Sequence, residues 1–368
     1  MAQQLRRRLS LLAASALLGS SLAGTAVAPA LADPGRVAGS ADPASAPELP
    51  RGDSTDRIGR VGSARETVHY KITRSSPGEQ VVLGVLGPAG TGEGYLRVET
   101  ATATGLDCAR MSVSPGYGRG SGALEPFGDC RNDTEVIVSI SRGSTGAVDQ
   151  DLLLRLQQVP VPVNPVPDSV AGVELNAKPP SDPSPLPPGE SPWTAAALPA
   201  RGGISGTLQP GKPAWYRADV GWGQQLDASL FQAKDAGPDA PRVAITVYDP
   251  ALNTLGETRQ RLSETGAGRT TEPVLVKNFP GDPSDPNPFL AGQFLIALTI
   301  DSEDGQPAAP VDFVLSTSVL GDVTGVPITA EQQAAARAKQ TRRRVAVGLA
   351  SAGVACLAAS VVLFVRRR

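Results

Sequence analysis

The chain contains one histidine, His69, and this limits the chemistry that its residues could perform. A catalytic histidine needs a serine and a carboxylate to converge on its ring, yet the sequence has no G-x-S-x-G elbow or similar nucleophile motif. A half-exposed histidine on a β-strand is the simpler interpretation. We therefore predict that the protein is not an enzyme and has no catalytic residue, with a hydrolase as the least favoured alternative.

Two loops in the C-terminal half each carry several acidic or amide residues. One holds Asp282, Asp285 and Asn287, and the other holds Asp301, Glu303 and Asp304. Loop carboxylates and carbonyls of this kind can bind calcium, but neither group follows the D-x-[DN]-x-[DN]-G spacing. Solvated turns are the expected interpretation, and we predict no metal ion and no cofactor.

Trp215 and Trp222 flank an expected strand that contains Tyr216. If their rings are exposed, they could stack on a sugar, so Trp215, Tyr216 and Trp222 are the candidate binding residues. The alternative is burial, because aromatic side chains at strand and turn positions more often belong to the core.

The composition excludes a strongly charged protein. The 368 residues include 34 Lys and Arg against 36 Asp and Glu, which gives a net charge of −2. No general positive field is available to hold phosphates, so nucleic acid is not an expected partner. The chain also has 40 Gly and 34 Pro, about a fifth of its residues, which indicates folded segments that alternate with linkers.

Residues 1–32 have the three parts of an export signal. Arg6 to Arg8 are basic, Leu9 to Leu18 are largely apolar, and Ala30-Leu31-Ala32 offers small residues for cleavage before Asp33. Ala26-Val27-Ala28 is the alternative cleavage site.

Val345 to Val365 is a run of 21 residues without a charge. At about 1.5 Å per residue, a helix of this length spans roughly the 30 Å hydrocarbon core of a bilayer. The arginines before this run outweigh those after it, but a cleaved signal commits the preceding chain to export. We therefore predict a single-pass type I protein of the cell membrane, with residues 33–344 outside and 366–368 in the cytoplasm.

The exported part divides by composition. Residues 33–64 have almost no large apolar side chains and are expected to be disordered. Residues 65–158 show short β-branched or alternating runs separated by Gly and Pro turns, which predicts a first β-sandwich. Its cysteines, Cys108 and Cys130, are most simply a disulfide in an exported chain, since zinc would need two further ligands.

Residues 159–202 are rich in proline and are expected to form an extended linker, in which Trp193 could dock on a neighbouring domain. Residues 203–320 predict a second β-sandwich. Thr329 is then expected to cap a helical stalk within residues 321–344, which leads into the membrane span.

The two β regions resemble each other. Val68 to Ile72, followed by Gln80-Val81, aligns with Ala214 to Ala218, followed by Gln225-Leu226, with a one-residue gap. In each region, a strand with Tyr beside a basic residue leads through a Gly turn to an apolar strand. We infer a duplication.

The second region also carries a set of short motifs at ordered positions. They are Gly206-Thr207-Leu208-Gln209-Pro210-Gly211, Trp215-Tyr216, Gly223-Gln224-Gln225-Leu226, Val243 to Asp249 and Ala291-Gly292-Gln293-Phe294. This series resembles the bacterial pre-peptidase C-terminal (PPC) domain, and the first region keeps only its Tyr and Gly-Gln elements. The resemblance implies two jelly-roll-like sandwiches in tandem with a binding or accessory role outside the cytoplasm, although no protease domain is present. The layout is also similar to that of actinobacterial membrane-anchored surface proteins.

The predicted function is that of a non-catalytic interaction protein on the cell surface, bound to another envelope protein or complex. The alternative is a module that binds cell-wall glycan. The identity of the partner, the oligomeric state and the pathway are not given by the sequence.

Overall fold

The computed structural model describes residues 34–87, 95–113, 120–143, 148–172, 178–232, 242–261, 267–279, 287–301 and 309–342. The predicted export signal and the predicted membrane span lie outside these ranges. Among the helices of the described ranges, none is both long and apolar enough to cross a bilayer.

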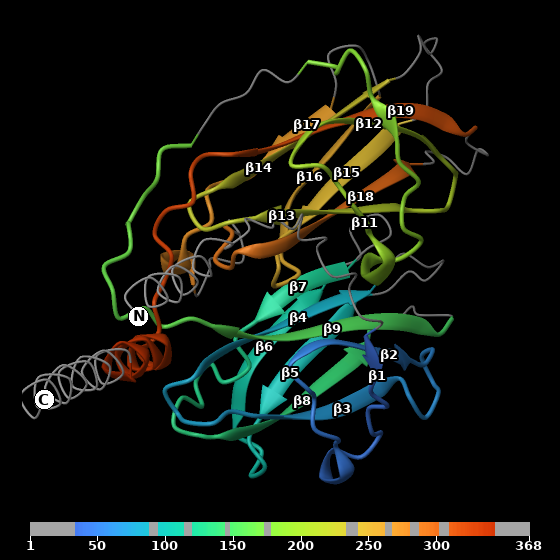
Figure 1. Cartoon of the computed structure of the whole chain (residues 1–368). Helices are drawn as coiled ribbons and strands as arrows, with labels where there is room; N and C mark the ends of the chain where they lie inside the picture. The colour runs from blue at the N-terminus through green and yellow to red at the C-terminus, as the bar shows by residue number, and fades with distance from the viewer. Residues whose placement is uncertain are drawn as a thin grey trace, which may run out of the picture. The chain divides into compact units, whose positions relative to one another are not determined.

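Four β-sheets build the described part of the chain, which confirms the prediction of an all-β protein made of sandwiches (Figure 1). The first sandwich pairs a five-stranded sheet, in the order β1-β2-β9-β4-β7, with a four-stranded sheet, in the order β3-β8-β5-β6. Among its described strand pairs, β1 with β2 is parallel and the others are antiparallel. The strands are β1 (Gly35–Arg36), β2 (Gly52–Ile58), β3 (Thr67–Thr73), β4 (Gln80–Gly87), β5 (Leu96–Ala101), β6 (Asp107–Val113), β7 (Gly120–Leu124), β8 (Glu135–Arg142) and β9 (Gln150–Val159).

The second sandwich repeats this plan. Its two sheets have the orders β10-β12-β19-β14-β17 and β11-β13-β18-β15-β16. The strands are β10 (Ser184–Pro185), β11 (Ala196–Ala197), β12 (Arg201–Leu208), β13 (Ala214–Val220), β14 (Gln225–Gln232), β15 (Arg242–Tyr248), β16 (Thr254–Arg261), β17 (Ala267–Thr270), β18 (Gly292–Asp301) and β19 (Val311–Leu320). Strand for strand, the order matches that of the first sandwich, with β11 added at an edge. The inferred duplication therefore agrees with the topology.

The predicted alignment of the two regions also has a structural counterpart. It places β3 on β13, and each of these strands pairs with the matching neighbour, β8 or β18. Tyr70 and Tyr216 occupy the same place in their sandwiches, and both side chains are fully buried. In β3, Val68, Tyr70 and Ile72 alternate with partly exposed residues, so one face of the strand enters the core.

The segment 33–64 was expected to be disordered, and the structure differs. Its described part contributes β1, the short 3-10 helix η1 (Pro43–Ser45) and β2. The buried Asp56 carboxylate holds this segment, because it accepts hydrogen bonds from the Tyr70 hydroxyl (2.6 Å), the Gly39 amide (2.8 Å) and the Arg65 guanidinium (3.0 Å). These partners are specific contacts that composition does not reveal.

The proline-rich segment 159–202 differs from expectation in the same way. Its end forms β10, the 3-10 helix η2 (Pro192–Thr194) and β11. These elements precede β12 in the second sandwich, just as β1 and η1 precede β2 in the first. Ser191 caps η2 through a reciprocal pair of hydrogen bonds with Thr194. An extended proline-rich chain can lie along a sheet edge because few of its amides need partners. Both the segment expected to be disordered and the segment expected to be a linker thus contribute the first elements of a sandwich.

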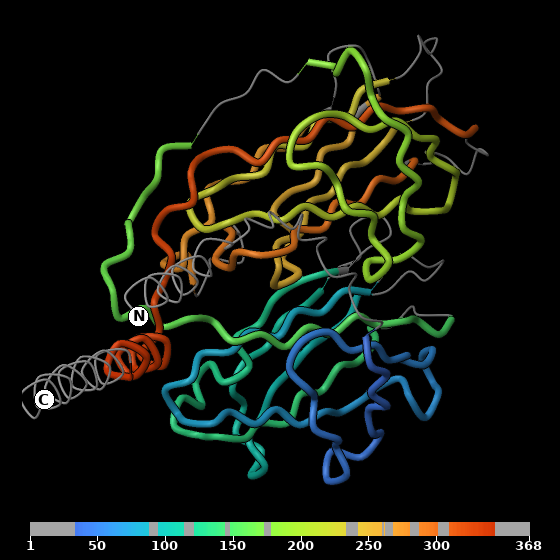
Figure 2. The backbone as a smooth tube through the Cα atoms, viewed as in Figure 1, coloured from blue at the N-terminus to red at the C-terminus, as the bar shows by residue number. Residues whose placement is uncertain are grey.

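The chain after β9 returns to the chain after β19 (Figure 2). The Val163 amide donates to the Ile328 carbonyl (2.8 Å), and the Asn164 side chain bonds both Ile328 and Val326. Thr329 then caps a helix over residues 330–342, because its hydroxyl accepts from the Gln332 amide while the Gln332 side chain accepts from the Thr329 amide. The predicted N-cap is confirmed.

The two sandwiches share buried apolar side chains and belong to the same compact unit of the chain. One cluster joins Leu86 and Leu153 to Trp215, Tyr248, Leu252 and Leu295. A second joins Val82 and Val159 to Ala251, Val276, Phe289 and Leu290. The outer face of the sheet that contains β4 and β9 therefore packs on the second sandwich, which explains why β4 is buried along both of its faces.

The turn between β15 and β16 lies closest to β4. A Cβ atom added at Gly84 would overlap the carbonyl oxygen of Ala251 in this turn, so the two backbones meet where only glycine fits. The Ala123 amide donates to the Asn253 side chain (3.3 Å), and the Ser121 and Thr254 hydroxyls bond each other (2.5 Å). The turn is therefore held by polar contacts as well as by apolar packing.

We predict that Gly84→Ala separates these backbones and lowers the free energy of unfolding by about 1–3 kcal/mol, as overpacking of a close contact does. Urea denaturation of the purified protein measures the change. Gly78→Ala is the matched control, because Gly78 is exposed and an added Cβ there meets no atom within 4 Å. Equal stability of the two variants would contradict the close contact.

Candidate functional site

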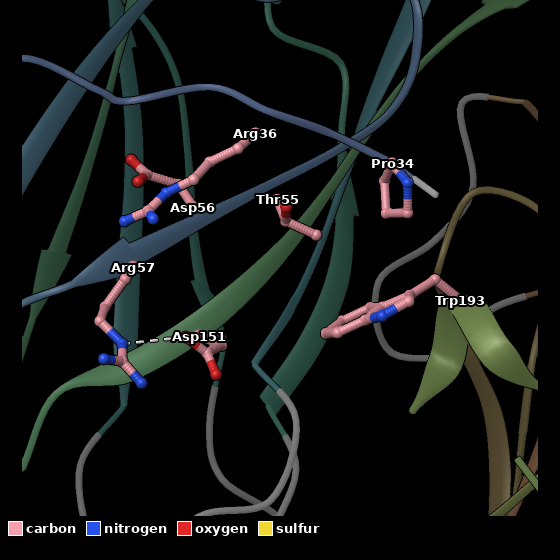
Figure 3. A pocket seen from close by; sticks show the side chains of 7 residues that line it. All are labelled: Pro34, Arg36, Thr55, Asp56, Arg57, Asp151 and Trp193. Carbon is pink, nitrogen blue, oxygen red and sulfur yellow. Dashed lines mark hydrogen bonds and ion pairs between the residues drawn. The ribbon is translucent and has the colours of Figure 1, made fainter. Parts of the chain in front are cut away.

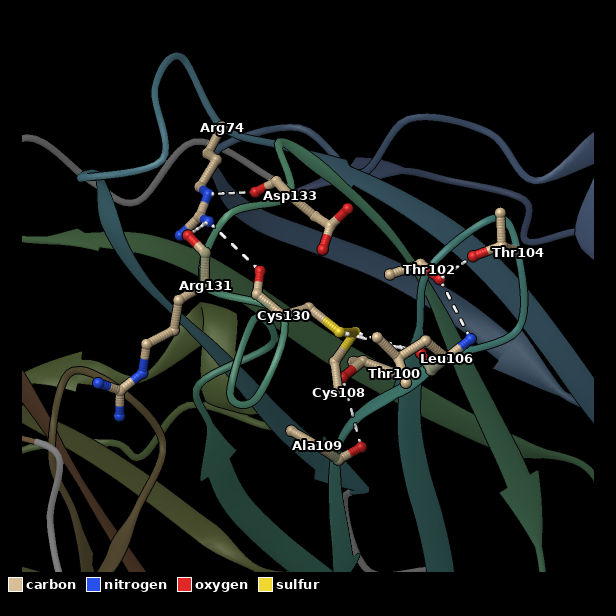
Figure 4. Close-up of a disulfide and its surroundings, with 10 residues drawn as sticks. All are labelled: Arg74, Thr100, Thr102, Thr104, Leu106, Cys108, Ala109, Cys130, Arg131 and Asp133. Carbon is tan, nitrogen blue, oxygen red and sulfur yellow. Dashed lines mark hydrogen bonds between the residues drawn. A yellow bond between two sulfur atoms is a disulfide. The ribbon is translucent and has the colours of Figure 1, made fainter.

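Cys108 and Cys130 form the predicted disulfide (Figure 4). Beside it, Arg74 is buried and its guanidinium lies 4.0 Å from the centre of the Phe127 ring. The same group donates to the carbonyls of Asp133 (2.7 Å) and Arg131. Burial lowers the pKa of Arg74, and nearby carboxylates oppose that shift. The disulfide and Arg74 together fix the chain between β7 and β8, which is a structural role.

The three predicted binding residues do not form an exposed surface. Trp215 and Tyr216 are fully buried, because consecutive side chains of β13 point to opposite faces and both faces are covered. Trp215 packs against Leu86 and Leu153 of the first sandwich, and its ring centre lies 5.9 Å from that of Tyr248 on β15 of its own sandwich. Tyr216 lies in the core of the second sandwich. Trp222 is half-buried against two apolar clusters. Burial, the alternative interpretation, thus holds for Trp215 and Tyr216, and neither ring can stack on a sugar here.

His69 does meet a serine. Its Nδ1 atom lies 2.8 Å from the Ser139 hydroxyl, because the two residues face each other across β3 and β8. Burial lowers the pKa of His69, and the negative charge of Asp42 acts in the opposite direction. The Asp42 carboxylate accepts from the Ala44 amide and the Ser45 hydroxyl at the start of η1. This is a cross-strand pair on a regular sheet, without the sharp turn that presents a nucleophile.

Metal ligands of the usual kinds do not gather in groups of three within the ranges that the structure describes. Asn287 lies in a described loop, whereas Asp282, Asp285, Glu303 and Asp304 fall outside the described residues. The two acidic loops therefore remain a prediction from the sequence.

A cavity of about 430 Å³ lies where the first sandwich meets η2 (Figure 3). It is lined by Pro34, Arg36, Thr55, Asp56, Arg57, Asp151 and Trp193. Figure 3 shows the Trp193 ring beside Pro34 and Thr55, and the Arg57 and Asp151 side chains next to each other further along the wall. The cavity thus joins an aromatic wall to a charged one.

Strand pairing brings the charged residues of this cavity together. Arg36 of β1 pairs with Thr55 of β2, and Arg57 of β2 pairs with Asp151 of β9. Arg57 and Asp151 form an ion pair at 3.0 Å, with 56% and 54% of their side chains exposed. Trp193 comes from η2 and packs partly against the apolar cluster shared by the sandwiches. Its predicted docking on a neighbouring domain agrees with this contact.

Arg36 and Arg57 are not among the residues predicted from the sequence, because both lie in the segment that was expected to be disordered. A signal was present. Residues 42–52, which read Asp-Pro-Ala-Ser-Ala-Pro-Glu-Leu-Pro-Arg-Gly, resemble residues 191–202, which read Ser-Pro-Trp-Thr-Ala-Ala-Ala-Leu-Pro-Ala-Arg-Gly. Each run precedes a matching strand, so the repeat extends further upstream than the aligned strands.

A buried ionic group lies at the contact between the sandwiches. The Arg155 guanidinium, 5% exposed, donates to both oxygens of Asp53 (2.5 and 3.0 Å) and to the Pro250 carbonyl (3.0 Å). Next to Pro250, Asp249 is fully buried and accepts from the Asn253 amide (2.8 Å). Its Oδ2 atom has no hydrogen-bond partner among the described residues. Burial raises the pKa of Asp249 to about 7, against the lowering effects of the backbone amides and of Arg155.

No family model matches the chain, and no curated protein matches it in sequence. Solved structures give distant similarities. One is PliG of Aeromonas hydrophila, a periplasmic inhibitor of g-type lysozyme, with 12% identity, a TM-score of 0.24, and coverage of 34% of this chain and 94% of that chain. A Burkholderia cenocepacia protein has 10% identity, a TM-score of 0.18, and coverage of 71% and 81%. The ANXUR2 extracellular domain of Arabidopsis thaliana has 8% identity, a TM-score of 0.20, and coverage of 73% and 89%. These TM-scores are too low to support an inference about function.

The Asp249 carboxyl predicts a stability that depends on pH. Because its pKa is raised from 3.8 to about 7, the folded protein keeps a proton between these values that the unfolded chain releases. Stability should therefore fall as the pH rises from about 4 to about 7, by up to about 1.4 kcal/mol per pH unit from this group. Urea denaturation across this range measures the slope.

In Asp249→Asn the contribution of this group should disappear, whereas the exposed Asp219→Asn should keep the wild-type slope. A wild-type slope in Asp249→Asn would show that another group titrates.

Proposed function

We propose that this protein is a non-catalytic interaction protein, anchored in the membrane, which binds another envelope protein or complex outside the cytoplasm. The Cys108–Cys130 disulfide supports an oxidising compartment, since such bonds are rare in the cytosol. The predicted export signal (1–32) and span (345–365) support a single-pass type I orientation. The two sandwiches are proposed to be jelly-roll-like domains of the PPC type, on the strength of the motifs around Trp215-Tyr216 and Gly223 to Leu226.

A patch of apolar side chains carries this proposal. It consists of Val161, Val163, Val326 and Ile328, and we call it the valine patch. Their exposed fractions are 42–49%, and the hydrogen bond between Val163 and Ile328 places the two pairs side by side. Neighbouring exposed apolar residues often mark a contact with another protein. Because the helix over 330–342 begins just after Ile328, a membrane protein anchored nearby is the partner that fits this position best.

We also propose that the protein has no catalytic activity. His69 and Ser139 are held as a cross-strand pair, and the Asp42 carboxylate is engaged by its own turn. The described cavity is lined by other residues than these three. The arrangement therefore supports a histidine that stabilises the sheet rather than one that activates a nucleophile.

Glycan binding is a second candidate function, and the observation that favours it is the cavity beside Trp193. Trp193 is half-buried and lines a space that also contains charged groups. Clefts with an aromatic wall and a few polar groups are common ligand sites. Trp193 therefore replaces the buried Trp215 as the candidate residue for stacking on a sugar.

We predict that Val163→Asp combined with Val326→Asp disrupts binding to the partner protein. Two carboxylates in an apolar contact cannot be desolvated without loss, so crosslinking in intact cells should capture roughly tenfold less partner. Mass spectrometry of the crosslinked species identifies and quantifies it. Val61→Asp is the matched control, because Val61 is 40% exposed and lies in the turn between β2 and β3. Unchanged capture by the double variant would contradict the assignment of the patch.

A further inference from the structure

We infer that the cavity beside Trp193 binds a carboxylate-bearing sugar, as one unit of an acidic polysaccharide. This inference rests on glycan binding, the second candidate function, and assigns it a site and a class of ligand. The residues that carry it are Arg36, Arg57, Asp151 and Trp193.

Arg36 supplies the cation that recognises the ligand's carboxylate. Its side chain is exposed, and within the described residues it forms neither an ion pair nor a hydrogen bond. The parallel pairing of β1 with β2 fixes its backbone beside Thr55. A planar guanidinium binds a carboxylate through two parallel hydrogen bonds, which gives direction as well as charge. Asp56 lines the same cavity, but its carboxylate is engaged by Gly39, Arg65 and Tyr70. Arg36 is therefore placed to bind the carboxylate of a ligand.

Arg57 and Asp151 supply a donor and an acceptor to the same space. Their ion pair is more than half exposed, so solvent screens it and it contributes little to stability. Its guanidinium and carboxylate can therefore also bond to a ligand at low cost. A sugar hydroxyl both donates and accepts, and this mixed pair of side chains matches that chemistry.

Trp193 supplies the apolar wall. Its ring packs partly on the cluster that contains Leu86 and Leu153, which fixes its orientation, and it also lines the cavity. The ring is thus held firmly while part of it faces the ligand space (Figure 3). A sugar ring has an apolar face of C–H groups that packs on an indole, with its polar groups at the edge. A volume of about 430 Å³ is in the range of small-ligand sites.

The second sandwich shows that the fold does not require these residues. In its matching sheet, Pro185 pairs with Ser205 and Thr207 pairs with Asp312, where the first sandwich has Arg36 with Thr55 and Arg57 with Asp151. The Thr207 hydroxyl donates to Asp312 (2.7 Å), so the carboxylate is kept while both arginines are replaced. In η1, Ala44 stands where η2 has Trp193. Arg36, Arg57 and Trp193 thus have no counterparts of the same chemistry at the matching positions of the repeat.

A strongly acidic peptide fits the cavity less well. The Trp193 ring would face a charged chain rather than the apolar face of a sugar ring. One unit of an acidic polysaccharide brings a single carboxylate, hydroxyls and an apolar ring face into the cavity, so it uses all four side chains, and we favour it.

The test measures binding of a galacturonic acid trisaccharide to the full-length protein in mild detergent, by isothermal titration calorimetry. The neutral galactose trisaccharide and a triglutamate peptide are the comparison ligands. We expect the acidic sugar to bind at least roughly tenfold more tightly than either, with a similar loss in Arg36→Gln and in Arg57→Gln, the effect of one charge-assisted hydrogen bond. Arg110→Gln is the control, because Arg110 is 69% exposed, forms a surface ion pair with Asp107 and lies on β6.

Equal binding of the neutral sugar, tighter binding of the peptide, or wild-type affinity in Arg36→Gln would each overturn the assignment. A parallel pull-down with purified peptidoglycan distinguishes glycan binding in general from binding of an acidic sugar in this cavity. Retention on the wall polymer without binding of the acidic trisaccharide would leave glycan binding in place and reject this site. Binding of neither would reject both.

Discussion

A buried guanidinium lies at the contact on which the arrangement of this molecule depends. Arg155 of β9 forms a two-bond ion pair with Asp53 of β2, and its third bond reaches the Pro250 carbonyl in the turn between β15 and β16. A buried charge that loses a partner is strongly destabilising, so the turn must stay where it satisfies the guanidinium. Asp249, buried beside it, adds a carboxyl whose pKa is raised to about 7 by the same burial. Apolar packing holds the sandwiches together, and this polar group fixes where they meet.

That contact buries several residues that a single sandwich would leave less covered. On an isolated second sandwich Trp215 would lose its contact with Leu86 and Leu153, and on an isolated first one β4 would lose the cover of its outer face. The proline-rich chain between the sandwiches is used in the same way, since η2 places Trp193 against the shared cluster and into the cavity that contains Arg36. The chain after β9 in turn bonds to the chain before the C-terminal helix. Both proposed surfaces, the valine patch and the cavity, thus depend on the two halves keeping one relative position.

Local patterns in the sequence predicted the elements that local physics determines. Alternation in β3, the pairing of Cys108 with Cys130, the Thr329 cap and the correspondence of β3 with β13 all agree with the structure. The predictions that were wrong are those that depend on contacts between residues far apart in the sequence. The segment before β2 lacks large apolar residues, but Asp56 bonds it to Tyr70 and Arg65. The cavity could not be predicted, because its charged residues converge only through the pairing of β1, β2 and β9, and its tryptophan comes from the other sandwich.

Cooperativity is the most direct test of the claim that the sandwiches form one body. Differential scanning calorimetry of the full-length protein in mild detergent, at a pH below 7 where Asp249 keeps its proton, compares the calorimetric with the van't Hoff enthalpy. Coupled sandwiches should unfold in a single transition with an enthalpy ratio of about 1, the mark of two-state behaviour. Two resolved transitions, or a ratio of about 2, would show that the sandwiches unfold independently and would contradict the account.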